Sequence, residues 1–229
     1  MALTRISEPT GRPWIDSIAL TKADARSADR QLSSRKSHLV LGGTGEAGPA
    51  FWATVLVGLT ESSRSFLAAV PQVLDRRDLT RFFVRPPAEP MLSLQWPAPA
   101  EVTPWQPRTP PTLPTKVTLT LAFDATSDDQ RAVAERLQVK LGPLGYRVVL
   151  TPVAAAELES SRADLVMRSV LLAPSPRVSA SILSRLGPAD RLLPLYARGL
   201  NVQRGPEVKN LHRTAWGLPD LADIFLAGD

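Results

Sequence analysis

Histidine, serine and paired carboxylate side chains are the groups in this sequence whose types could support catalysis or metal binding. The two histidines, His38 and His212, lie far apart, and neither has a second histidine or a carboxylate at a spacing typical of metal ligands. No serine occupies the Gly-x-Ser-x-Gly pattern of a nucleophile elbow, and the absence of cysteine excludes thiol nucleophiles and thiolate zinc sites. The sequence therefore predicts a protein that is not an enzyme and that holds no cofactor or metal ion.

A glycine-rich segment, Gly43–Gly48, has the glycine spacing of a dinucleotide-binding loop and follows a short apolar run. Pro49 follows at once, and the next residues have the pattern of a strand instead of an amphipathic helix. No acidic residue ends a second strand about 20 residues later, where such a loop requires one. We therefore interpret the segment as a flexible glycine turn between two strands, and a dinucleotide-binding enzyme is our third hypothesis for the function.

The charge pattern bears on nucleic-acid binding. The 27 basic and 22 acidic side chains give a net charge of +5, and the basic residues are scattered among acids. The one dense cluster, Asp75–Arg81, has the pattern of a solvated helix face instead of a stripe that follows phosphates. We therefore expect no nucleic-acid partner.

Apolar runs bear on the location of the chain. No stretch approaches the ~20 consecutive apolar residues of a membrane span, so we expect no span. The first residues, Met1–Pro9, lack the apolar run of ~7–15 residues that a signal peptide requires. These patterns predict either a cytoplasmic chain or one whose natural N-terminus is missing.

Strands and helices are predicted to alternate on both sides of a proline-rich connection. Ten of the 22 prolines fall between Pro86 and Pro114, where missing amide donors and fixed φ angles exclude helix and central strand. Before this connection, residues 86–115, the predicted strands are 14–20, 38–41 and 51–59, and the predicted helices are 27–35 and 65–83. After it, the predicted strands are 116–123, 146–150 and 163–167, and the predicted helices are 128–141 and 154–160. This order favours parallel α/β layers with right-handed crossovers.

Two local signals refine the helices. Ser127 and Gln130 fit a capping box, in which the serine accepts a backbone amide near Gln130 and the glutamine side chain bonds back. Pro71 falls inside the helix predicted over 65–83, so it has to lie in a first turn or at a kink.

Four stretches of the sequence are similar, in the same order along the chain, to segments of one known protein family. Gly-Arg-Pro-Trp-Ile-Asp-Ser-Ile at 11–18 is similar to an Arg-Pro-aromatic-x-Asp-x-Ile strand, and 66–79 is similar to a helix that contains Ala-Ile-Asp-Arg. Residues 118–148 include Ala-Glu-Arg-Leu-Gln at 134–138, and the chain ends with Leu-Pro-Leu-Tyr at 193–196 and Trp-Gly-Leu-Pro-Asp-Leu at 216–221. Together they resemble the extracellular solute-binding proteins of family 5, the oligopeptide, dipeptide and nickel-binding components of ABC importers.

This resemblance implies an α/β fold of the periplasmic-binding-protein type II, with mixed sheets and flanking helices. The family's N-terminal half has no counterpart here, so the resemblance implies a truncated or divergent member with one complete lobe plus part of the second. Residues 1–48 would form partial lobe I, residues 49–195 lobe II with the proline-rich connection, and residues 196–229 the C-terminal return to lobe I. A periplasmic location, ABC permease subunits as partners, and small-molecule or peptide ligands are implied as well.

The resemblance also supplies candidate ligand-binding residues. Asp124 stands where dipeptide-binding members have an arginine that meets the ligand carboxylate. Arg168 and Ser169 stand at the family's Gly-Trp segment, and Leu172 is near the position of the aspartate that receives the ligand's amine. Because both charges are lost or inverted, a zwitterionic peptide is not expected to fit such a site.

Trp52 and Tyr196 complete the predicted cleft wall, Trp52 because it stands next to the glycine segment where the chain would cross between lobes. The leading hypothesis is a non-enzymatic solute-binding component that closes two lobes over its ligand. The alternative is a degenerate structural or interaction module that completes its fold with another chain, which would supply the missing lobe.

Overall fold

The computed structural model describes residues 2–5, 15–19, 25–85, 88–94, 116–172, 175–214, 219–221 and 224–226. Contacts divide the chain into two compact units, one formed by Met1–Phe51 with Gly199–Asp229 and the other by Trp52–Arg198. The lobe boundaries predicted from the sequence stay a prediction. Most of the proline-rich connection, and four of the five tryptophans, lie outside the described residues.

The first unit contains short antiparallel strand pairs and one helix. β1 (Ala2–Arg5) pairs with β2 (Ile15–Ala19), β9 (Val208–Lys209) with β12 (Phe225–Leu226), and β10 (His212–Arg213) with β11 (Pro219–Asp220). The helix α1 (Ala25–Ser33) begins two residues before its predicted start. Leu39, Val202, Val208 and Ile224 form a small buried core.

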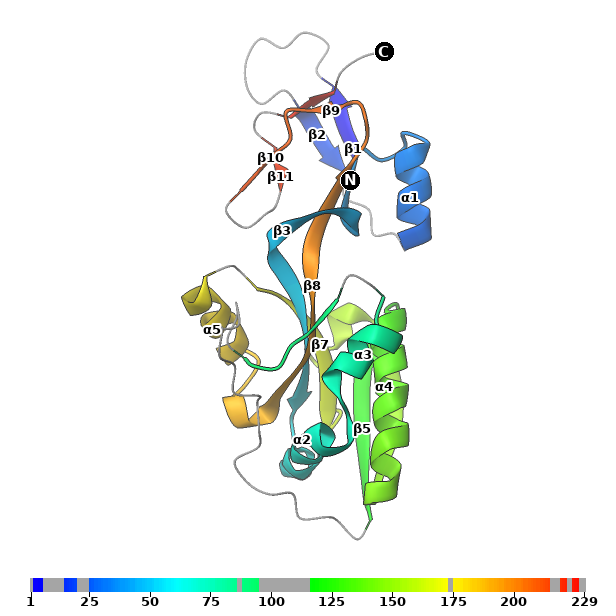
Figure 1. Cartoon of the computed structure of the whole chain (residues 1–229), viewed down its shortest axis with the longest axis vertical. Helices are drawn as coiled ribbons and strands as arrows, with labels where there is room; N and C mark the ends of the chain where they lie inside the picture. The colour runs from blue at the N-terminus through cyan, green and yellow to red at the C-terminus, as the bar shows by residue number, and fades with distance from the viewer. Residues whose placement is uncertain are drawn as a thin grey trace. The chain divides into compact units, whose positions relative to one another are not determined.

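The second unit is built on a six-stranded sheet in the order β4-β8-β3-β7-β5-β6. Its strands are β4 (Glu89–Pro90), β8 (Leu192–Arg204), β3 (Leu39–Gly58), β7 (Leu165–Leu172), β5 (Val117–Asp124) and β6 (Tyr146–Val153), of which β3 and β8 continue into the first unit. Its helices are α2 (Glu61–Val73), α3 (Arg76–Phe82), α4 (Asp128–Leu141) and α5 (Pro176–Ser184), with short 3-10 turns η1 (Gly142–Leu144), η2 (Ala155–Glu157) and η3 (Ala189–Arg191). α4 lies along β5 and contacts α2, while α5 contacts β7 (Figure 1). None of the described helices combines the length and the apolar character that crossing a membrane requires.

The sheet is mixed. β5 pairs in parallel with β6 from Val117 opposite Tyr146 onward, and it pairs in parallel with β7. The β7–β3 neighbours run antiparallel, because the amide of Leu59 donates to the Asp164 carbonyl at 2.8 Å while Thr54, earlier in β3, meets Ser169, later in β7. The prediction of parallel α/β layers is therefore confirmed for β5, β6 and β7 and is wrong for the rest of the sheet.

The segment Gly43–Gly48 lies inside β3, a single strand of 20 residues. The turn predicted between two strands is therefore wrong. The dinucleotide-binding loop is wrong as well, because such a loop has to open a helix and here the strand continues to Gly58. Glycine weakens a strand locally, but main-chain pairing with a long neighbour such as β8 outweighs that low propensity.

The helix predicted over 65–83 is two helices. α2 starts at Glu61 and carries Pro71 in its last turn, where the missing amide leaves the hydrogen-bond ladder weaker. Asp75 then caps α3, since its carboxylate accepts the backbone amide of Arg77 at 2.8 Å. The helix predicted over 154–160 is also wrong in extent, because only the 3-10 turn η2 forms there.

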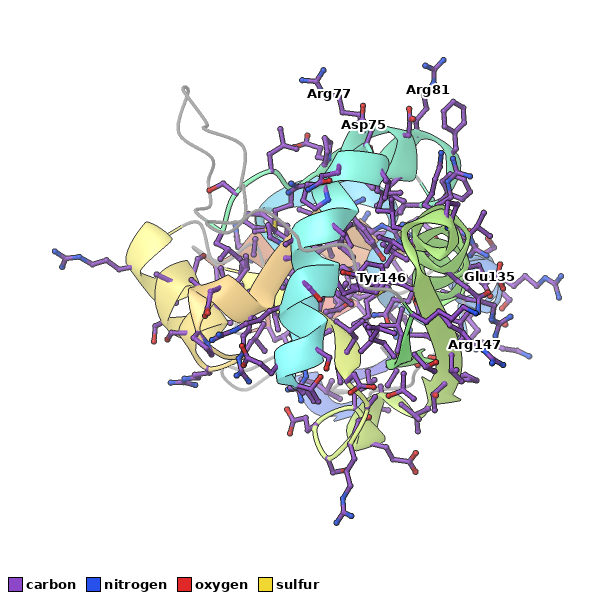
Figure 2. The ribbon with its side chains drawn as sticks, turned by 90° about the horizontal axis from the view of Figure 1, so that it is seen from below. Asp75, Arg77, Arg81, Glu135, Tyr146 and Arg147 are labelled. Atoms are coloured by element: carbon purple, nitrogen blue, oxygen red, sulfur yellow. The ribbon has the colours of Figure 1, made fainter. Side chains whose placement is uncertain are left out.

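The main core of the second unit lies between the sheet and the helices α2 and α4. Tyr146, at the start of β6, is 2% exposed and points into this core between α2 and α4 (Figure 2). Its ring packs edge to face on Phe66 of α2, with ring centroids 5.4 Å apart. The Tyr146 hydroxyl is buried and has no hydrogen-bond partner within the described part of the chain.

We expect Tyr146→Phe to raise the free energy of unfolding by about 1 kcal/mol, because the ring contact stays and an unsatisfied buried hydroxyl is removed. Urea unfolding followed by circular dichroism measures the change. Tyr146→Leu is the matched variant, and its loss of the contact with Phe66 should destabilise the unit. If Tyr146→Phe proves less stable than the wild type, the hydroxyl is hydrogen-bonded in solution.

Candidate functional site

The site is built where β5 ends and α4 begins. The Ser127 side chain caps α4 by accepting the Gln130 amide at 3.2 Å, which confirms the predicted cap. The Gln130 side chain does not return to Ser127, however. Its Oε1 accepts the backbone amide of Asp124 at 2.9 Å, and its Nε2 donates to Ser169 Oγ at 3.0 Å. These two partners fix which end of the Gln130 amide faces the sheet.

Ser169 extends the hydrogen bonds across the sheet. Its Oγ lies 3.2 Å from Thr54 Oγ1, and Thr54 in turn hydrogen-bonds the Tyr196 side chain. Gln130, Thr54 and Tyr196 are almost fully buried, whereas Ser169 is exposed. These four side chains, from α4, β7, β3 and β8, form what we call the polar network, and none of them carries a charge at neutral pH.

Tyr196 is held in its neutral form. Burial raises the pKa of Tyr196 to about 12, and Asp129 acts in the same direction, while the hydrogen bond from Thr54 and the charge of Arg198 oppose the shift. The hydroxyl therefore stays protonated at physiological pH. It can donate and accept hydrogen bonds, but it does not serve as a base.

Two ion pairs border the polar network. Arg198 pairs with Asp129 at 2.6 Å, and Arg85 pairs with Asp128 at the same distance. Asp129 also accepts the backbone amide of Arg85, and Arg198 donates to the Arg85 carbonyl. Both acids stand in the first turn of α4, where the helix dipole favours negative charge. The charges beside the network are therefore compensated within the second unit.

Three of the predicted site residues share one face of the sheet. Trp52 precedes Thr54 by two residues in β3, so the two side chains point to the same side. Ser169 and Tyr196 reach that side as well, because both bond to Thr54. The indole of Trp52 is 40% exposed, which leaves an aromatic surface beside the network.

Asp124 and Arg168 are engaged elsewhere. Asp124 Oδ1 accepts the amide and the hydroxyl of Thr126, at 2.9 and 2.7 Å, and so closes the turn after β5. Arg168 directly precedes Ser169, so its side chain lies on the other face of β7, where it donates to the Leu158 carbonyl at 3.1 Å. The structure does not bring these two charged groups to the polar network, and their role as ligand contacts stays a prediction.

The sequence did not single out Thr54, and it singled out Gln130 only as a helix cap. The cap was a usable signal, since a glutamine three residues into a helix that follows a strand stands near the end of that strand. Thr54 gave no such signal, because a β-branched residue within an apolar strand has the pattern of an ordinary core position.

The chemistry that this arrangement supports is binding by hydrogen bonds and aromatic contact. Among the described residues, no group of three or more histidine, cysteine, aspartate or glutamate side chains comes together as a metal site would require.

No protein-family model matches the chain, and no curated protein matches its sequence. Solved structures do match. NikA from Brucella suis in complex with Fe(III)-EDTA aligns with a TM-score of 0.60 at 13% identity, over 89% of this chain and 60% of that chain. The oligopeptide-binding protein AppA from Bacillus subtilis, in complex with a nonapeptide, gives 0.61 at 10% identity, over 90% and 59%. The ABC transporter substrate-binding protein CtaP from Listeria monocytogenes gives 0.56 at 12% identity, over 87% and 54%.

This chain has the solute-binding-protein fold. The fold class implied by the sequence resemblance, a periplasmic-binding-protein type α/β fold with mixed sheets, is thereby confirmed. The chain spans 54–60% of the length of these three structures, which is consistent with partial lobes. Since sequence identity is 13% or lower, the likeness shows the fold alone.

Proposed function

We propose that this chain is the solute-binding component of an ABC-type importer and that its ligand contacts Ser169 and Trp52, with the rest of the polar network behind them. The observation that carries the proposal is the convergence of four uncharged polar side chains beside an exposed indole, on a fold shared with substrate-binding proteins. Buried polar groups that are already oriented by one another give a ligand site its specificity.

The proposal extends to the lobes, the divergence, the location and the partners that the family resemblance implies. The second unit, Trp52–Arg198, would correspond to lobe II of the family, and the first unit to lobe I. The chain would be a divergent member, because the charges that dipeptide-binding relatives use are inverted at Asp124 and lost near Leu172. A periplasmic location, partnership with permease subunits and a non-enzymatic role would follow from the same family.

A thermal-shift screen with peptides, saccharides and metal ions, followed by isothermal titration calorimetry, tests the proposal. One ligand class should raise the unfolding temperature of the wild type. Trp52→Ala should then weaken binding by about tenfold, since aromatic contacts dominate small-molecule sites. Val149→Ala on the edge strand β6 is the matched control, because Val149 is 41% exposed and Trp52 40%.

The two parts of the proposal fail separately. If no ligand class shifts the unfolding temperature, the binding function is wrong. If a ligand binds but Trp52→Ala and Ser169→Ala retain wild-type affinity, the function stands and the site is wrong. Circular dichroism of each variant verifies that it is folded, which we expect because both side chains are exposed.

A further inference from the structure

The charged side chains that border the polar network in the described part of the chain have partners of their own. Asp129 is held by Arg198, and its side chain is only 13% exposed. Asp128 is held by Arg85, and Asp124 closes its own turn through Thr126. A charged ligand group placed here would have to displace one of these partners or remain without a counter-charge, and both are unfavourable in a partly desolvated site.

Among the described residues at this surface, the groups that remain available to a ligand are uncharged. Thr54 lies beside Ser169 and Leu59 beside Asp164, and the same antiparallel register continued by two residues puts Trp52 opposite Leu171. This surface therefore offers the Trp52 indole, the half-buried side chain of Leu171 and the exposed Ser169 hydroxyl. It combines a flat apolar platform with a hydroxyl that the buried Gln130 amide orients from behind.

We infer that the ligand is an uncharged, hydrogen-bonding molecule with one flat apolar face. The inference rests on the proposed function and specifies the substrate class of that same site. Stacking on the indole favours a flat face, and bonding to Ser169 requires a hydrogen-bonding group such as a hydroxyl or an amide. The pairing of the charges that border the site favours a neutral group. Two sources carry this chemistry, a neutral saccharide and a peptide segment whose ends are blocked or lie outside the site.

Calorimetric titration with three probes tests the inference. They are cellobiose, the zwitterionic dipeptide alanyl-phenylalanine, and the same dipeptide with an acetylated N-terminus and an amidated C-terminus. We expect at least one neutral probe to bind at least about tenfold more tightly than the zwitterion, because charged ends lose hydration without gaining partners. The neutral probe that binds identifies the source, and Trp52→Ala should weaken it.

Equal or tighter binding of the zwitterion overturns the inference and leaves the proposed function standing. Binding of none of the three probes also overturns it, while a response to another class in the wider thermal-shift screen would keep the solute-binding function. Failure of the whole screen overturns both.

A charge variant gives a second readout. Asp129→Asn removes the carboxylate that pairs with Arg198, so a dipeptide with an acetylated N-terminus and a free carboxylate should gain affinity relative to its fully blocked form. Asp128→Asn is the matched control, because its partner Arg85 is 58% exposed and already solvated. If the ratio of the two affinities is the same in Asp129→Asn and wild type, internal pairing is not what excludes charged ligands.

Discussion

Replacing Arg76 with methionine should lower the free energy of unfolding of the second unit by about 3 kcal/mol. Arg76 is 6% exposed, and its Nη1 donates to the carbonyls of Met91 at 2.8 Å and Pro194 at 3.1 Å. It thereby joins α3 to β8 and to the segment after β4. Methionine keeps much of the side-chain volume but leaves two buried carbonyls without this donor, and each such loss costs about 1–3 kcal/mol.

The environment of the guanidinium supports this expectation. Burial lowers the pKa of Arg76, and Asp75 acts in the opposite direction, so the charge sits in a desolvated place and depends on its hydrogen bonds. Urea unfolding of the variant, compared with Arg77→Met, isolates the effect, because Arg77 is the exposed neighbour in the same helix. Equal stability of the two variants would contradict the role assigned to Arg76 and would indicate that water replaces its donor.

The burial of Arg76 could not be predicted from the sequence. The cluster Asp75–Arg81 was predicted to be a solvated helix face, and this is confirmed for Arg77 and Arg81, which project from the body in Figure 2. The prediction is wrong for Arg76. A charge pattern records which residues are polar, but the carbonyl of Pro194 that Arg76 contacts lies 118 residues away in the sequence. No residue near Arg76 in the sequence indicates a partner so far along the chain.

The accurate parts of the fold prediction depend on local rules. β5, α4 and β6 form one strand-helix-strand unit whose alternation and helix cap lie within 37 residues (117–153). Their parallel pairing follows from the crossover between them. The long strand β3 has no local explanation, since its glycine-rich half is a strand only through main-chain pairing with a distant neighbour.

Only part of the candidate site could likewise be predicted from the sequence. Ser169 and Tyr196, which lie in stretches that carry the family resemblance, and Trp52, which stands next to the glycine segment, were predicted site residues, and the structure places them on one face. The resemblance also predicted Asp124 and Arg168, whose contacts lie elsewhere. The link between Thr54 and Ser169 spans 115 residues, and strand register, which decides it, cannot be derived from composition or spacing.

Gly58→Ala should lower the free energy of unfolding by about 2 kcal/mol, because the end of β3 has no room for a methyl group. A Cβ at Gly58 would overlap Ser63 Oγ and lie 2.9 Å from Leu67 Cδ1. Ser63 cannot turn away freely, since its hydroxyl donates to the Thr60 carbonyl at 2.6 Å and the residue is fully buried. The glycine is thus required by space instead of by an unusual φ angle.

Gly142→Ala is the matched control for this prediction. Gly142 has helical φ and ψ angles of −51° and −49°, and outside its two chain neighbours nothing lies within 4 Å of a Cβ placed there. The same substitution at this position should leave stability within about 0.5 kcal/mol of the wild type, because the entropy that alanine removes from the unfolded chain is offset by the crowding of its Cβ against Pro143 in a helical conformation. Only the Gly58→Ala urea midpoint should therefore fall clearly. A Gly58→Ala midpoint equal to or above that of the wild type would mean that α2 shifts away from the end of β3 at little cost, and that the packing of Ser63 and Leu67 there is loose.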